Sequence, residues 1–137
     1  VMIIWAGLLM AVFMYAVIAS VGLDGGEPSA AKPDAALAQL FAWLAAAASG
    51  ASLFLRSVLL GGFSSGKLSV ETEAGRVRFM TGNIVCFALA ESVAIFGLVL
   101  AFTGRPQSDC LVFFAAAVVL MLIHIPLPGR FVPKRLA

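Results

Sequence analysis

The sequence predicts an all-α fold, in which a polytopic integral membrane protein forms an antiparallel bundle of four transmembrane helices. Hydrophobic residues make up 62% of the 137 residues. Charged residues make up 12%, whereas an ordinary globular chain has about 25%. Four stretches of the chain are apolar over most of the roughly 20 residues that a helix needs to cross a bilayer. Lipid is therefore the expected solvent of this protein.

The four helices are expected at about residues 2–22, 35–60, 79–103 and 111–127, within one membrane domain that covers residues 1–137. A helix satisfies every backbone N–H and C=O inside its own segment, as lipid requires, and the period-2 pattern of a membrane barrel is absent. The connecting segments are short and contain many turn-forming residues. Sequential helices are therefore expected to be antiparallel neighbours.

Two groups of residues predict helix ends. Pro33 and Asp34 suit the start of the second helix, because proline cannot extend a preceding helix and the aspartate can accept from unpaired N–H groups. Pro126 and Pro128, followed by Gly129, are expected to end or kink the fourth helix near His124.

The basic residues predict the orientation. If the N-terminus is cytoplasmic, seven basic residues fall on the inner side and only Lys32 and Arg105 on the outer side. By the positive-inside rule, both termini and the loop at 61–78 are then expected to be cytoplasmic. The expected location is a bacterial inner (plasma) membrane. The seven inner residues are Arg56, Lys67, Arg76, Arg78, Arg130, Lys134 and Arg135.

One acidic residue lies deep in the third predicted helix. Glu91 is the sole charged residue between Arg78 and Arg105, close to the middle of that apolar interval. An ionised acid at the bilayer midplane costs several kcal/mol, so we expect Glu91 to face the bundle and to be protonated or partnered. Hydroxyl groups are the expected partners, and the candidates are Tyr15, Ser49, Ser52 and Ser92.

Small residues recur every fourth position on two helices, which lets helices approach closely in a membrane. We expect these two stripes to meet in a tight hairpin, with Glu91 at the edge of the contact. The first stripe is Ala38, Ala42, Ala46 and Gly50, and the second is Gly82, Cys86, Ala90 and Ala94.

The stretch FALAESVAIFGLVLAF, residues 87–102, resembles the carboxylate-bearing helix of the rotary ATP synthase proteolipid, or c subunit, family. The resemblance implies that Glu91 binds a proton or sodium ion, with Ala88, Ala94 and residues 95–98 around it. It does not cover the whole chain: the family's Gly-x-Gly-x-Gly run and Arg-Gln-Pro loop are absent, and the acid is in the third of four helices.

Other kinds of site find little support in the sequence. Motifs for zinc proteases, phosphate-binding loops and nucleophilic catalysis are absent, so we predict no enzyme activity, no catalytic residue, no metal and no cofactor. The net charge of +2 does not indicate a nucleic-acid partner. His124 is interpreted as an anchor near the inner interface. Cys86 and Cys110 lie at different depths, so no disulfide is expected between them.

Two hypotheses about function follow. In the first, the protein is non-enzymatic and Glu91 binds or translocates a proton or cation, as in a proteolipid. In the second, the chain is an accessory or assembly subunit of a larger membrane complex, and Glu91 is a buried hydrogen-bonding residue. The lipid bilayer and either a homo-oligomer or a larger membrane complex are the expected partners.

Overall fold

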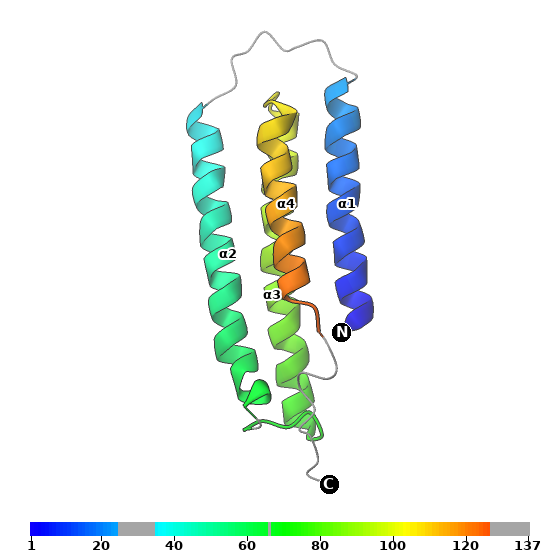
Figure 1. Ribbon diagram of the computed structural model, residues 1–137, viewed down its shortest axis with the longest axis vertical. Helices are drawn as coiled ribbons and strands as arrows, with labels where there is room; N and C mark the ends of the chain where they lie inside the picture. The colour runs from blue at the N-terminus through cyan, green and yellow to red at the C-terminus, as the bar shows by residue number, and fades with distance from the viewer. Residues whose placement is uncertain (25–34, 66, 127–137) are drawn as a thin grey trace.

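The computed structural model describes residues 1–24, 35–65 and 67–126, and all regular secondary structure within them is helical. The four helices are α1 (Met2–Asp24), α2 (Ala35–Ser64), α3 (Glu73–Phe102) and α4 (Gln107–Ile123). They run alternately up and down along one long axis (Figure 1). The prediction of an all-α chain with four antiparallel helices is therefore confirmed.

Three of the helices, α1, α2 and α3, are long and apolar enough to cross a membrane. The fourth, α4, has 17 residues and is about 25 Å long at 1.5 Å per residue, which is shorter than a hydrocarbon layer of about 30 Å. The expectation of four full-length membrane helices is thus met by three of them. The fourth prediction extended to residue 127, four residues beyond the observed end of α4.

The helix at the centre of the bundle is α3, which packs against the three others. In its most apolar stretch 44% of the residues are buried, against 11% in α1 and 17% in α2. The sequential helices α1 and α2 barely touch, which corrects the prediction that they are neighbours. In Figure 1, α3 and α4 lie between them. Most of the surface of α1 and α2 is therefore not covered by the other helices.

The loop predicted at residues 61–78 is largely helical, because α2 continues to Ser64 and α3 begins at Glu73. The start of α3 is capped by Thr72, whose hydroxyl accepts a hydrogen bond from the Gly75 amide at 3.1 Å. A cap of this kind satisfies an amide that would otherwise be unpaired, so the helix can extend beyond the apolar stretch into its charged flank. This local signal was missed in the sequence.

The end of α4 agrees with the helix stop predicted near His124, although not with the predicted range to residue 127. His124 caps α4, and its backbone amide donates to the Leu120 carbonyl at 2.9 Å. The buried Pro126 follows two residues later and cannot prolong the helix. The predicted signals at Pro33, Asp34, Pro128 and Gly129 lie outside the described residues.

The main core forms where α1, α3 and α4 meet. Its largest fully buried side chains include Val12 of α1, Phe87 of α3 and Met121 of α4. The backbones of α3 and α4 approach closely at Gly97, where an added Cβ would lie 2.7 Å from Phe113 Cβ and 3.2 Å from the Cys110 carbonyl oxygen. A glycine is needed at this contact because any side chain would meet the facing helix near its main chain.

Candidate functional site

The predicted acid, Glu91, lies on the central helix where α1 packs against α3. Its side chain is half-buried rather than sealed. The Tyr15 hydroxyl of α1 donates a hydrogen bond to Glu91 Oε1 at 2.9 Å. Because Tyr15 and Glu91 are 76 residues apart in the chain, this bond ties the first helix to the third. Of the four hydroxyl partners predicted for Glu91, Tyr15 is therefore confirmed.

The other three predicted partners bond elsewhere, which corrects that part of the prediction. Ser92 and Ser49 donate to carbonyls of their own helices, at 2.8 Å and 2.7 Å. Ser52 lies on α2 and takes part in a different polar cluster. A serine in a helix readily bonds to a carbonyl one turn back, and this local bond competes with any partner on another helix.

Within the described part of the chain, no basic side chain forms an ion pair with Glu91. Its environment is instead apolar, with Ile95 exposed one turn along α3 and Leu98 half-buried. A carboxyl with one phenolic donor can be held in place in either protonation state, because its oxygen accepts from the hydroxyl whether or not the group is ionised. The Tyr15 hydroxyl is therefore a suitable donor to either form of the carboxyl.

A second polar cluster lies toward the end of the bundle that holds Val1. We call it the His124 cluster; it consists of Ser52, Arg56, Cys86 and His124. His124 Nε2 is hydrogen-bonded to the Ser52 hydroxyl, and His124 Nδ1 lies 3.2 Å from Arg56 Nη1. The Ser52 hydroxyl also donates to the Cys86 carbonyl at 3.2 Å, and the Cys86 thiol lies 3.6 Å from the Ser52 carbonyl. The cluster thus joins α2, α3 and α4.

The partners of His124 assign its tautomer. Arg56 has only donors, so Nδ1 must accept and carries no proton. The Cys86 carbonyl can only accept, so the Ser52 hydroxyl gives its proton to that carbonyl and must accept from Nε2–H. The neutral Nε2–H ring satisfies all three contacts. In this tautomer the ring cannot take the proton of Ser52, so the cluster does not prepare a nucleophile.

His124 is fully buried, with 0% of its surface exposed, and this corrects its interpretation as an interfacial anchor. The sequence predicts that His124 and Arg56 lie in the same half of the bundle, but it does not predict that they are in contact. The 68 residues between them are spanned because α4 runs antiparallel to α3, and so parallel to α2, which brings its C-terminal end level with Arg56 (Figure 1). The sequence contains one signal for this contact. His124 is at the end of one apolar helix, in the same half of the bundle as Arg56 inside another.

The small-residue stripes do not meet as predicted. All four members of the α3 stripe are buried: Gly82, Cys86, Ala90 and Ala94. At Gly82 the stripe meets large side chains of α2, because an added Cβ there would lie 3.1 Å from Leu60 Cδ2 and 3.2 Å from Leu59 Cβ. On α2, Ala38 is half-buried, whereas Ala42, Ala46 and Gly50 are exposed. At this end of the hairpin a glycine of α3 therefore faces leucines of α2 rather than the predicted small-residue stripe.

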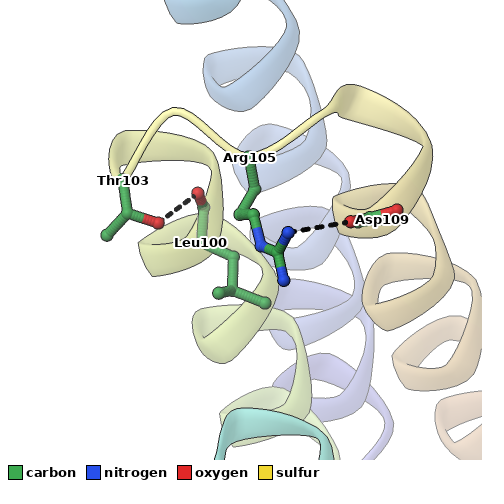
Figure 2. A network of polar contacts seen from close by, with 4 residues as sticks. All are labelled: Leu100, Thr103, Arg105 and Asp109. Carbon is green, nitrogen blue, oxygen red and sulfur yellow. Dashed lines mark hydrogen bonds and ion pairs between the residues drawn. The ribbon is translucent and has the colours of Figure 1, made fainter. Parts of the chain in front are cut away.

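The far end of the bundle carries the turn between α3 and α4, shown in Figure 2. The Thr103 hydroxyl donates to the Leu100 carbonyl at 2.8 Å, and Arg105 Nη1 lies 3.9 Å from Asp109 Oδ2. Gly104 has a φ of +77°, which lets the chain turn sharply between the helices. This network orders the turn.

Trp5 and the two cysteines also contribute polar groups to the core. The indole Nε1 of Trp5 donates to the Met121 carbonyl of α4 at 2.8 Å. Cys86 and Cys110 are both buried free thiols. No group of three metal-ligating side chains occurs among the described residues.

In comparisons with known proteins, no family model, no curated protein and no solved structure matches the chain. The likeness of residues 87–102 to the proteolipid helix stays a prediction.

Proposed function

We propose that this protein is a small, non-enzymatic integral membrane protein in which Glu91 reversibly binds a proton within the bilayer. The hydrogen bond from Tyr15 to Glu91 supports this proposal most directly. It places a carboxyl on the central helix of the bundle, in the apolar interval between Arg78 and Arg105, with a neutral partner. Intramembrane acids of this kind are usually functional, because burying one without a purpose is costly.

A proton is the favoured ligand over a metal cation. Hard cations such as Ca²⁺ or Mg²⁺ take about six or more oxygen ligands. Glu91 has one hydroxyl partner in the described residues, and that hydroxyl donates its proton to the carboxyl. A proton needs only the carboxyl oxygen itself. In this proposal both termini lie in the cytoplasm, in keeping with the excess of basic residues on one side, and the membrane is a bacterial inner membrane.

The proposal is tested by labelling with a hydrophobic carbodiimide in native membranes over a range of pH. The reagent attacks a protonated carboxyl that it can reach from lipid. We expect wild-type protein to be labelled and the labelling to fall as the pH rises. Glu91→Gln should abolish the label, whereas Glu73→Gln, which removes an exposed acid from the first turn of the same helix, should leave it unchanged. Absence of Glu91 labelling at every pH would overturn the proposal.

A second candidate function is that of an assembly subunit, favoured by the exposed stripe on α2. Ala42, Ala46 and Gly50 leave a shallow apolar surface, and an added Cβ at Gly50 would meet no atom within 4 Å. Small residues at the surface of a membrane helix permit close approach of another helix. Under this hypothesis Ala46→Leu breaks assembly while Glu91→Gln is tolerated, as judged by the size of the complex in mild detergent. Ala90 is unsuitable for this test, because it is fully buried within the chain's own core.

A further inference from the structure

The hydrogen bonds that join α4 to α2 lie at the C-terminal end of α4, at His124. Elsewhere these helices barely touch. An apolar groove of about 280 Å³ lies between them, with Ala42 and Ala46 of α2 on one side and Val112 and Ala116 of α4 on the other. The His124 cluster lies at the C-terminal end of α4, where His124 reaches Ser52 and Arg56 on α2. In Figure 1 this end of α4 points toward the same end of the bundle as the N-terminus.

A second proton on His124 would change one of its contacts from attractive to repulsive. In the neutral ring Nδ1 accepts from Arg56, 3.2 Å away. Protonation at Nδ1 sets an N–H against the N–H of Arg56 and puts a positive charge on the fully buried ring, 3.2 Å from the half-buried guanidinium. The dipole of α4 favours a positive charge at its C-terminus, but a full charge at this distance outweighs that partial charge.

The charged group in contact with the His124 ring is Arg56. It is the charged side chain of α2 that faces the ring, whereas α3 presents the neutral thiol of Cys86. From α1 the nearby polar group is the neutral indole of Trp5, which bonds to Met121. No carboxylate among the described residues pairs with His124. A charged imidazole here is fully buried and uncompensated, and it can gain water only if it moves.

We propose that His124 is an acid-operated latch. Neutral His124 ties the C-terminal end of α4 to α2, and protonation of Nδ1 releases that end from the bundle. The moving part is the end of α4, since His124 caps the helix whereas Ser52 and Arg56 lie within the continuous helix α2. This device is separate from Glu91, which is bonded to α1 instead.

The latch is tested with Trp5 as a built-in reporter in full-length protein in phospholipid nanodiscs. Trp5 donates to the Met121 carbonyl in the last turn of α4, so its emission reports on that turn. The other tryptophan, Trp43, is 70% exposed and is replaced by phenylalanine throughout. As the pH falls from about 8 to about 3, Trp5 emission should shift to the red and amides of residues 118–124 should exchange about tenfold faster or more.

Three variants decide the outcome. His124→Gln keeps a donor for Ser52 and an acceptor for Arg56 but cannot titrate, so its emission should match wild type at pH 8 and not change in acid. Arg56→Gln removes the opposing charge and should move the transition to higher pH. Glu91→Gln should leave the transition in place. A flat wild-type profile, or the same transition in His124→Gln, would overturn the latch; an unmoved midpoint in Arg56→Gln would also contradict it.

Discussion

Replacing Gly97 by alanine should destabilise the bundle, although alanine is the better helix former. An added Cβ at Gly97 would lie 2.7 Å from Phe113 Cβ and 3.2 Å from the Cys110 carbonyl oxygen, where ordinary contact begins at 3.4 Å. Neither atom is the end of a flexible side chain. Helix α4 must therefore move by about 0.7 Å, and the packing around the contact is disturbed.

The expected magnitude follows from two opposing terms. Glycine to alanine inside a helix gains about 1 kcal/mol of helix propensity. Overpacking a close contact costs about 1–3 kcal/mol. Gly97→Ala should therefore change the free energy of unfolding by between about zero and a loss of about 2 kcal/mol. Gly50→Ala is the matched control, because it makes the same change in a helix where no atom lies within 4 Å.

The two variants are compared by titrating SDS into mixed micelles and following helix content by circular dichroism. We expect Gly97→Ala to unfold at lower SDS than wild type and Gly50→Ala at the same or higher SDS. The difference between them should be about 1–3 kcal/mol, since the propensity term is common to both. Equal stability of the two variants would refute the inference that α3 and α4 are in main-chain contact at Gly97.

Three further outcomes are expected. Tyr15→Phe removes the donor to Glu91 and should lower the free energy of unfolding by about 1 kcal/mol in the same titration, with helix content unchanged; unchanged stability would argue against the bond. Thr72→Ala should cost about 1 kcal/mol and speed amide exchange in the first turn of α3, whereas exchange limited to other helices would contradict the cap. Cys86 and Cys110 should resist maleimide in the folded protein and react in SDS, and rapid labelling in the folded state would show that they are not buried.

The helices could be predicted because composition and length suffice for them. Apolar stretches placed the middle of every helix correctly, since lipid-like sequences must satisfy their backbone locally. The ends were less well placed. α3 begins at Glu73 rather than Phe79 because a threonine cap lets the helix run into its charged flank. The apolar pattern contains no information about such a cap.

The candidate site, like the helices, could be predicted only in part from the sequence. Glu91 stands out in the sequence because an acid in an apolar interval is rare. Its partner could only be narrowed to four hydroxyls, because nothing along the chain says which faces of α1 and α2 turn toward α3. The structure selects Tyr15. It leaves Ser49 and Ser92 bonded to their own helices.

The sequence by itself determined the all-helical nature of the chain, its apolar surface and the position of an acid on the third helix. These follow from local chemistry, namely the hydropathy of each segment and the identity of single residues. The tertiary structure alone decided that α3 is central, that α1 and α2 hardly meet, and that His124 joins Ser52 and Arg56. Such contacts depend on helix rotation and on which helices pack together, and both are set by the fit of side chains across the whole bundle.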